Sequence, residues 1–388
     1  MGSHSRVHYM DNLRAFAMLL GIFFHAALAY SPMLHQLWPT SDQENAALVD
    51  ILAFFTHTFR MPLFFIIAGF FTALLISKRG LSSMFKNRLM RVTLPLAIFL
   101  PLILVSFAII FGWAMESIEN KSPLLGMIAM MAHMPEAPKP PVTTTHLWFL
   151  YNLTFFYLLA VLAAKFINFD WAQKVFNYPK LFLLLSPLLI VPALVTQHAP
   201  FPAPEQFAPQ LWSFGFYGLL FLLGCGLYKN ETFLDSLRPY LIYLLATSII
   251  AYGIFYSLLP KGMNMQQVME NAMNAPELTS KNFALALLQA IPAIYMSLSL
   301  LIIGKTWMNK QSIWVRKIAD SSYWIYIIHL PVLWVIQFLL LDVQLPLIIE
   351  FLISAFGKLF IGYISYLLLV KPTPIGWLLN GKKKPSNS

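Results

Sequence analysis

Long apolar stretches, separated by short polar or charged ones, run along the whole sequence. A helix needs about 20 residues to cross the roughly 30 Å apolar core of a bilayer. Windows of that length predict ten transmembrane segments: 10–30, 48–76, 89–112, 145–166, 181–197, 209–228, 239–259, 282–304, 319–340 and 346–370. The second is too long for one straight helix, and Arg60 and Pro62 lie near its middle, so we expect a kink or break there. The predicted fold class is all-α, a polytopic membrane bundle of about ten helices forming one domain over residues 1–388.

The composition supports lipid as the main surroundings of this chain. Of its 388 residues, 59% are apolar and 11% are charged, whereas a soluble domain carries about 25% charged residues. So few charged side chains cannot cover a soluble fold of this size. We therefore expect a multi-pass membrane protein in contact with lipid. Its first apolar segment lacks the form of a cleaved signal peptide and is expected to be retained.

The positive charges are unequally divided between the two sides of the predicted bundle. One side holds nineteen Lys and Arg residues: Arg6, Lys78, Arg79, Lys86, Arg88, Arg91, Lys165, Lys174, Lys180, Lys229, Arg238, Lys305, Lys310, Arg316, Lys317, Lys371 and Lys382 to Lys384. The opposite side holds four: Lys121, Lys139, Lys261 and Lys281. Cytoplasmic loops are the ones enriched in Lys and Arg. We therefore expect both termini, including the basic tail 371–388, in the cytoplasm. We interpret the net charge of +10 as a signal that orients the protein in the membrane and not as a sign of nucleic-acid binding.

The first predicted segment carries ionisable residues on one helical face. Asp11, Arg14, Met18, Gly21 and His25 are separated by 3, 4, 3 and 4 residues, a spacing that repeats once per helical turn. Arg14 and His25 are then about 16 Å apart along the axis. The pattern fits an interfacial Asp11–Arg14 ion pair and a histidine bonded to a neighbouring helix, but the shared face also fits an active site. His25 is a candidate general base toward a hydroxyl group.

The next two segments add basic residues at two depths. His57 and Arg60 are one turn apart, and about ten residues separate Arg60 from either end of its segment, so its side chain is not expected to reach the interface. We propose Arg60 for stabilising a developing oxyanion. Lys86, Arg88 and Arg91 precede the third segment, and Arg88 and Arg91 share a face that suits phosphate contacts. A plain positive-inside anchor explains them equally well.

Further polar and aromatic residues lie in the later segments. His146 and Trp148 open the fourth segment at the exterior interface, where a Trp is expected in any case. Tyr323, Tyr326 and His329 follow an i, i+3, i+6 spacing that directs one face into the bundle. The candidate substrate contacts are His146, Trp148, His57, Tyr326 and His329. Lys358 lies in mid-segment, and whether it pairs with Glu350 stays open.

Several kinds of chemistry have no sequence signal in this chain. The motifs HExxH, GxxxxGK[ST], GxGxxG after a strand, and GxSxG are all absent. The histidines lack tight ligand spacing, so no metal is expected. A single cysteine, Cys225, excludes an internal disulfide.

Taken together, the motifs resemble the membrane acyltransferase family 3. The resemblance is carried by Asp11, Arg14 and His25 on the first helix, by FRMPLFFIIAGFF, by RLMR at Arg88 to Arg91, by HLWFL from His146, and by YWIYIIHLP. It covers residues 9 to about 370, and the first two segments are most similar to the glucan biosynthesis protein C branch. Members of that branch are bacterial inner-membrane enzymes that transfer acyl groups, succinyl in the named case, to periplasmic glucans.

The resemblance implies a reaction that crosses the membrane. Cytoplasmic acyl-CoA, either acetyl-CoA or succinyl-CoA, would meet a glycan hydroxyl arriving from the exterior. The family's histidine, arginine and aspartate correspond to His25, Arg14 and Asp11, and its basic pair to Arg88 and Arg91. The family often has a serine where this chain has Ala68, so any role of that serine is lost here.

A second hypothesis belongs to a different class, a proton-coupled secondary transporter or glycan exporter with the same buried His and Arg residues as a relay. Such proteins are built from inverted repeats with interrupted helices, and the chain shows one interrupted segment without a counterpart. The identity of the acyl group, the acceptor glycan and the oligomeric state are not encoded in any motif.

Overall fold

The computed structural model describes residues 7–381 apart from 135–140, 164–169, 261, 263–265, 268–269, 272–273, 311–312 and 344. Within these residues the chain contains helices and loops and no strand. The helices are α1 His8–Ala27, α2 Ala47–Arg79, α3 Leu81–Arg88, α4 Leu94–Ser117, α5 Pro123–Ala132, α6 Trp148–Ala163, α7 Asp170–Phe176, α8 Pro179–Leu194, α9 Leu211–Ser213, α10 Leu219–Leu227, α11 Thr232–Leu237, α12 Leu241–Leu258, α14 Ser280–Trp307, α15 Ile313–Leu340, α16 Leu347–Ser365 and α17 Pro374–Asn380. Short 3-10 turns are η1 Leu28–Tyr30, η3 Thr145–Leu147 and η5 Arg238–Tyr240, and π-helical turns are η2 Leu89–Thr93, η4 Phe214–Gly218 and η6 Tyr366–Val370.

Eight helical stretches among the described residues are long and apolar enough to cross a membrane: His8–Tyr30, Ala47–Arg79, Leu81–Ser117, Thr145–Ala163, Thr232–Leu258, Ser280–Trp307, Lys317–Leu340 and Leu347–Val370. They coincide with eight of the ten predicted segments. The other two are also apolar helices, but Pro179–Leu194 and Leu211–Leu227 are shorter than a full crossing requires. The predicted all-α polytopic bundle is thus confirmed.

The long helix α2 departs from the prediction in its continuity. It runs from Ala47 to Arg79 with Pro62 inside it, and the structure has no break at that position. A proline removes one backbone hydrogen bond, but such residues are tolerated in membrane helices that neighbouring helices surround. α2 packs against α1, α10 and α14, which keeps Arg60 and His57 on one continuous element.

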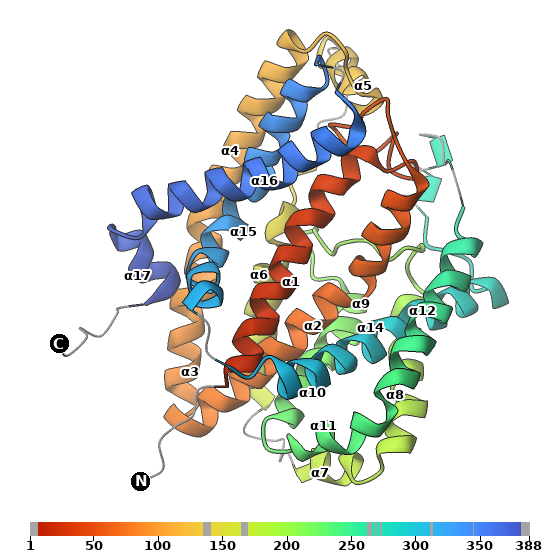
Figure 1. Ribbon diagram of the computed structural model, residues 1–388, viewed down its shortest axis with the longest axis vertical. Coiled ribbons are helices and arrows are strands. Elements are labelled where there is room, and N and C mark those ends of the chain that lie inside the picture. The colour runs from red at the N-terminus through yellow and green to blue at the C-terminus, as the bar shows by residue number, and fades with distance from the viewer. Residues whose placement is uncertain are drawn as a thin grey trace.

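Helix α1 lies in the interior of the bundle. It packs against α2, α14, α15 and α16, and Figure 1 shows it passing through the middle of the molecule between α16 on one side and α14 on the other. A helix with several ionisable groups is costly to expose to lipid. Its central position therefore places the predicted polar face among protein groups.

The contact between α2 and α10 is unusually close because two glycines face each other's backbone. A Cβ atom on Gly69 would lie 1.9 Å from the carbonyl oxygen of Phe221, and one on Gly224 would lie 1.9 Å from that of Ile66. The thiol of Cys225 donates to the Gly69 carbonyl at 3.3 Å. Small residues let membrane helices approach in this way.

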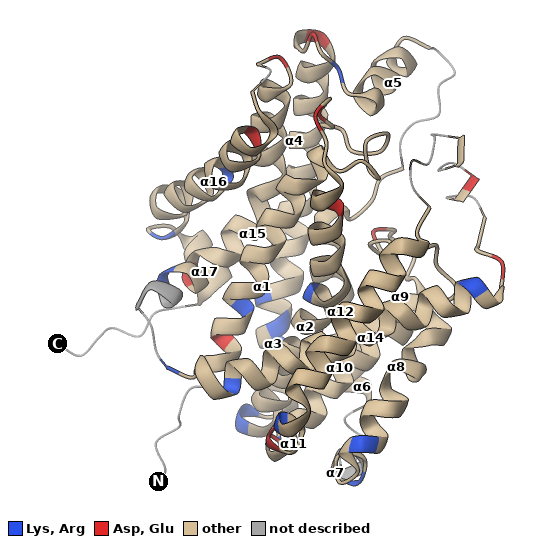
Figure 2. Cartoon of the chain, turned by 45° about the vertical axis from the view of Figure 1, so that its right-hand side comes forward, with Lys and Arg blue, Asp and Glu red and all other residues tan. Residues whose placement is uncertain are grey.

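The charged residues gather at opposite ends of the bundle according to sign. Figure 2 shows most Lys and Arg at the end that carries α3, α7 and α11, and Asp and Glu more often at the end near the α4–α5 connection. This is the distribution expected from the sequence. The assignment of the basic end to the cytoplasm stays a prediction.

Candidate functional site

A cavity of about 450 Å³ lies between α1, α2, η2, α6, α15 and α17. Eight of the twelve candidate site residues line it: Asp11, Arg14, His25, Arg60, Arg88, Arg91, Tyr326 and His329. The cavity therefore joins the basic end of the bundle to the buried histidine through residues that lie far apart in the sequence.

The polar face of α1 forms one wall of the cavity. Asp11, Arg14, Met18, Gly21 and His25 all line it, which confirms that the helical spacing places them on one face. Arg14 and Asp11 form an ion pair of 3.6 Å between Nη2 and Oδ1. Because Arg14 is three turns from His25, about 16 Å along the axis, it lies at the mouth of the cavity and not at the histidine.

At the inner end His25 contacts a second histidine from α15. Nδ1 of His25 lies 3.0 Å from the carbonyl oxygen of Gly21 and 3.2 Å from Nε2 of His329. Nδ1 of His329 lies 2.6 Å from the carbonyl oxygen of Tyr326. A carbonyl only accepts, so each Nδ1 must carry the proton. His329 Nε2 then accepts from His25 Nδ1–H, and His25 is left with an unprotonated Nε2.

That Nε2 atom is the chemically useful feature of the pair. No described residue hydrogen-bonds to Nε2 of His25, while Nδ1 is engaged twice. A neutral imidazole with a free lone pair, held in one tautomer by its other nitrogen, is the arrangement that a general base requires. His329 was a candidate substrate contact from the sequence, and its position beside His25 adds an orienting role.

Arg60 brings a buried positive charge to the same chamber. Its side chain is 4% exposed, its guanidinium carbon lies 4.3 Å from the centre of the Phe24 ring, and its Nη1 atom has no hydrogen-bond partner in the described chain. The Arg60 side chain lies against Gly21, where a Cβ atom would be 3.6 Å from Cδ of Arg60. A buried cation that has an aromatic ring beside it but no anionic partner among the described residues is costly, so this position favours a group that carries negative charge.

The two arginines of the basic pair have different surroundings at the mouth. Nη1 of Arg91 donates to the carbonyl oxygen of Asn380, at the end of α17, over 3.2 Å. Arg88 lies over the ring of Tyr157, 5.3 Å from its centre, and its buried Nε atom lacks a partner among the described residues. Lys86 is exposed and does not line the cavity. Of these basic residues, Arg88 thus has a hydrogen-bond donor, its Nε–H group, that no described residue engages.

Four candidate site residues lie outside the cavity lining: Lys86, His57, His146 and Trp148. His57 contacts the Phe201 carbonyl through Nε2 at 3.2 Å, and His146 contacts the Ile327 carbonyl through Nε2 at 2.9 Å. Trp148 is 6% exposed and packs on Phe65 and Tyr217. The rings of His57, His146 and Trp148 therefore support the walls behind the cavity.

Asn380 and Tyr323 line the cavity although neither was a candidate site residue. Asn380 belongs to α17, a short helix after the last span, and its side chain donates to the Asp320 carbonyl at 2.8 Å. Tyr323 donates to the Arg91 carbonyl at 2.9 Å, and its place on the Tyr326 and His329 face was the available clue. Lys358 lies outside the cavity lining, is fully buried and donates to the Ile22 carbonyl. Oε2 of Glu350 has no hydrogen-bond partner among the described residues, so the two side chains are not paired there.

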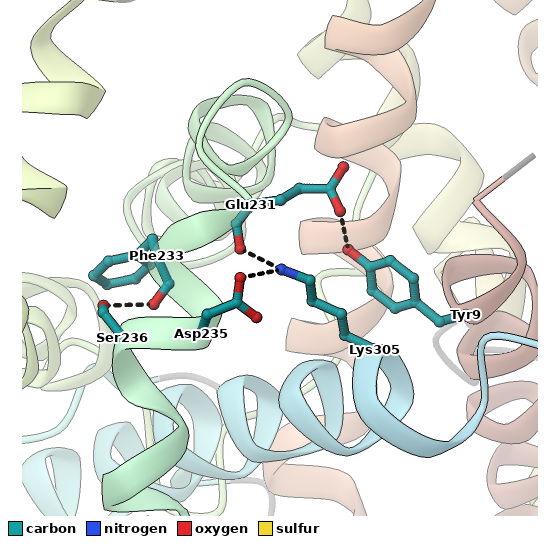
Figure 3. Close-up of polar contacts among 6 residues, drawn as sticks. All are labelled: Tyr9, Glu231, Phe233, Asp235, Ser236 and Lys305. Carbon is teal, nitrogen blue, oxygen red and sulfur yellow. Dashed lines mark hydrogen bonds and ion pairs between the residues drawn. The ribbon is translucent and has the colours of Figure 1, made fainter. Parts of the chain in front are cut away.

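A separate polar cluster fixes the N-terminal end of α1 (Figure 3). The Tyr9 hydroxyl donates to Oε2 of Glu231 at 3.2 Å, and Nζ of Lys305 donates to the Glu231 carbonyl and to Oδ2 of Asp235, each at 2.8 Å. Asn12 also donates to the Met308 carbonyl at 2.5 Å. The cluster ties α1 to α11 and to the end of α14, next to the helical turn that carries Asp11.

The ligands expected for a metal do not converge anywhere in the residues that the structure describes. No group of three His, Cys, Asp or Glu side chains there is placed to hold a metal ion.

Comparison with known proteins places these features in context. A family model for an acyltransferase domain matches residues 7–367. The glucans biosynthesis protein C of Salmonella paratyphi B, of Salmonella heidelberg and of Salmonella enteritidis are each 31% identical to the chain over 170 residues, which is 44% of this chain and 40% of each relative. The matched segment thus spans less than half the length of these relatives. No solved structure matches the chain. The family match extends over nearly the whole sequence, and the protein is a member of the acyltransferase domain family.

Proposed function

We propose that this membrane acyltransferase moves an acyl group, acetyl or succinyl, from cytoplasmic acyl-CoA to a hydroxyl of an extracytoplasmic glycan. The observation that carries the proposal is one cavity that joins a basic mouth to a histidine with a free Nε2 and to a buried arginine whose Nη1 atom has no hydrogen-bond partner among the described residues. The membership in an acyltransferase family supports the reaction class. The donor, the acceptor and the bacterial inner membrane as location are parts of the proposal.

The donor fits the basic end of the cavity by charge. Coenzyme A carries phosphates, and Arg88, Arg91 and Arg14 supply cationic groups at the mouth. Arginine binds phosphate through charge-assisted, often bidentate hydrogen bonds. The pantetheine arm of coenzyme A is narrow and uncharged, so the arm can extend past Met18 and Gly21 toward His25 while the phosphates stay at the mouth. Lys86, which is exposed nearby, adds only long-range attraction.

The reaction needs a base and a stabilised oxyanion. Nε2 of His25 takes the proton from the acceptor hydroxyl as its oxygen attacks the thioester carbonyl. The carbonyl oxygen gains negative charge, which the unpaired Arg60 guanidinium stabilises, an effect that is large in a site without water. The C–S bond then breaks, and the thiolate of coenzyme A takes the proton from His25. The new C–O bond is the ester of the product.

A donor-cleavage assay tests this proposal directly. The purified protein in lipid nanodiscs is incubated with acetyl-CoA or succinyl-CoA and a β-glucan oligosaccharide, and free thiol and labelled glucan are measured. We expect thiol release that depends on the glucan. Proton flux across vesicles without thioester cleavage would favour a transporter and overturn the proposal.

The two mouth arginines are expected to respond differently to charge removal. Arg88→Gln should raise the KM for acyl-CoA about tenfold, because a charge-assisted hydrogen bond contributes about 1.5–3 kcal/mol. Arg91→Gln should have a smaller effect on KM and lower the melting temperature, since it loses the bond to Asn380. Arg79→Gln, exposed at the end of α2, serves as the control. Equal KM values in all three variants would indicate that Arg88 and Arg91 orient the protein in the membrane and do not bind acyl-CoA.

Substitution of Arg60 is expected to lower activity without lowering stability. Arg60→Met is expected to lower kcat about 10²–10³-fold, the usual loss for one oxyanion-stabilising donor. The same change should leave the melting temperature equal or higher, because it removes a buried cation whose Nη1 atom has no hydrogen-bond partner among the described residues. Steady-state kinetics and thermal unfolding measure the two effects. A large fall in stability, with activity lost in proportion, would make Arg60 a structural residue.

A further inference from the structure

His146 bonds to a carbonyl group that a proline leaves without its helical donor. In an α-helix the carbonyl oxygen of residue 327 accepts from the N–H group of residue 331. Residue 331 is Pro331, which lies inside α15 and has no N–H group. The ring atom Nε2 of His146 lies 2.9 Å from the Ile327 carbonyl oxygen. Because a carbonyl only accepts, His146 carries a proton on Nε2 and replaces the missing donor.

A second hydrogen bond joins the same two segments in the opposite direction. The hydroxyl of Tyr326 donates to the carbonyl oxygen of His146 at 2.7 Å. The side chain and the backbone of His146 therefore each bond to α15, one as donor and the other as acceptor. His146 is 7% exposed, so water competes little for either bond. Two such bonds fix the position of η3 relative to one turn of α15.

The backbone directly before His146 is strained. Thr145 has a φ of 47°, in the left-handed region that a β-branched residue rarely adopts. Its neighbour Thr144 is anchored, because its backbone N–H and its hydroxyl both donate to the Glu205 carbonyl at 2.8 Å. Strained residues persist only where the surrounding structure holds them, and they cluster at functional sites. The strain here accompanies the turn that directs His146 toward α15.

The turn of α15 that His146 holds is also the one that contacts the base. Nδ1 of His329 lies 2.6 Å from the Tyr326 carbonyl oxygen, and Nε2 of His329 lies 3.2 Å from Nδ1 of His25. The rings of His146 and His329 meet edge to face with 5.0 Å between their centres. His146 itself does not line the cavity. An effect of His146 on the reaction therefore passes through α15.

We propose that His146 is a positioning residue, which holds the turn 326–329 of α15 so that His329 keeps His25 in the tautomer with an unprotonated Nε2. The inference rests on the proposed acyl transfer, in which that nitrogen acts as the base. It also connects two motifs that are far apart in the sequence, because the histidine of HLWFL supplies the donor that the proline of YWIYIIHLP removes.

Two variants of His146 test the positioning role by kinetics. His146→Leu removes the donor and should lower kcat for glucan-dependent thiol release about tenfold to hundredfold, since small displacements of a catalytic group have effects of this size. The KM for acyl-CoA should stay unchanged, because the mouth of the cavity is not altered. His146→Gln keeps an N–H donor and should restore most of kcat.

Tyr252→Phe is the matched control for the loss of one buried hydrogen bond. The Tyr252 side chain is 4% exposed, and its hydroxyl donates to the Ile51 carbonyl at 2.7 Å. It does not line the cavity. Like His146→Leu, this variant should lower the melting temperature, but it should keep the kcat of the wild-type protein.

A double-mutant cycle tests the link between His146 and the proline. Pro331→Ala gives residue 331 an N–H group that can bond to the Ile327 carbonyl. The fall in melting temperature that His146→Leu causes should therefore be smaller in the Pro331→Ala protein than in the wild-type protein. Equal falls in the two backgrounds would overturn the assigned replacement of the donor.

Histidine tautomers give a readout that does not require turnover. Solid-state nitrogen NMR of the histidine-labelled protein in nanodiscs should show His146 protonated on Nε2 and His25 protonated on Nδ1. In His146→Leu the His25 signal should become a mixture of both tautomers. An unchanged His25 tautomer in that variant, or a kcat equal to that of Tyr252→Phe, would overturn the positioning role. Absence of thioester cleavage by the wild-type protein, with the expected tautomers, would instead overturn the proposed function.

Discussion

His25→Ala is expected to lower the rate of acyl transfer by about 10²–10⁴-fold, the range associated with the loss of a positioned general base. The reason is local: Nε2 of His25 is the ring nitrogen that no described residue engages, and Nδ1 is fixed by Gly21 and His329. The measurement is kcat for glucan-dependent thiol release in nanodiscs.

The variant should still insert and accumulate, because the bonds that it loses lie within α1 and to one neighbouring ring. His8→Ala on the same helix is the matched control, since His8 does not line the cavity, and it should keep full activity. His329→Asn should show a smaller loss than His25→Ala, because it disturbs the orientation of the base without removing it. Full activity of His25→Ala would contradict the proposed mechanism.

Gly69→Ala and Gly224→Ala are each expected to destabilise the folded protein strongly. The added Cβ would lie 1.9 Å from a backbone carbonyl oxygen of the facing helix in both cases. Backbone cannot move aside as the end of a flexible side chain can, so α2 and α10 must separate. Overpacking typically costs about 1–3 kcal/mol and occasionally more, and we expect the upper part of that range. Yield of monodisperse protein and its melting temperature measure the effect.

The control for this prediction is Gly112→Ala on α4, where a Cβ would meet nothing within 4 Å. Alanine is favoured over glycine in a helix by about 1 kcal/mol, so this variant should be as stable as the wild-type protein or slightly more so. A melting temperature of Gly69→Ala equal to that of Gly112→Ala would show that α2 and α10 are not in close contact.

The helical nature of the chain and the positions of eight of the ten predicted segments followed from the sequence, since lipid offers no partner for backbone polar groups and so selects helices of a fixed length. The two segments that came out shorter, 181–197 and 209–228, are apolar enough but contain helix-limiting features: Pro187 and Pro192 in the first, and the π-turn Phe214–Gly218 in the second. Of the kink or break expected at Pro62, the break does not occur, because α1, α10 and α14 pack around α2.

Much of the site also followed from helical spacing. Asp11, Arg14 and His25 share a face because they recur once per turn, and Tyr326 and His329 share another for the same reason. Spacing says which residues lie together on one helix, but it says nothing about which helix they face. His57 and His146 are histidines in predicted membrane segments like His25, yet their rings bond to carbonyls behind the cavity.

The sequence by itself therefore determined that the chain is a helical membrane protein with a basic end, and which polar residues share a helical face, because hydropathy and the 3.6-residue repeat are properties of local sequence. Only the tertiary structure decided that His329 meets His25 across 304 positions, that Nη1 of Arg60 has no hydrogen-bond partner in the described chain, and that the ring of Trp38 stacks on that of His25. Those features depend on how separate helices pack, since each is a contact, or a missing hydrogen bond, between segments that are distant in the sequence.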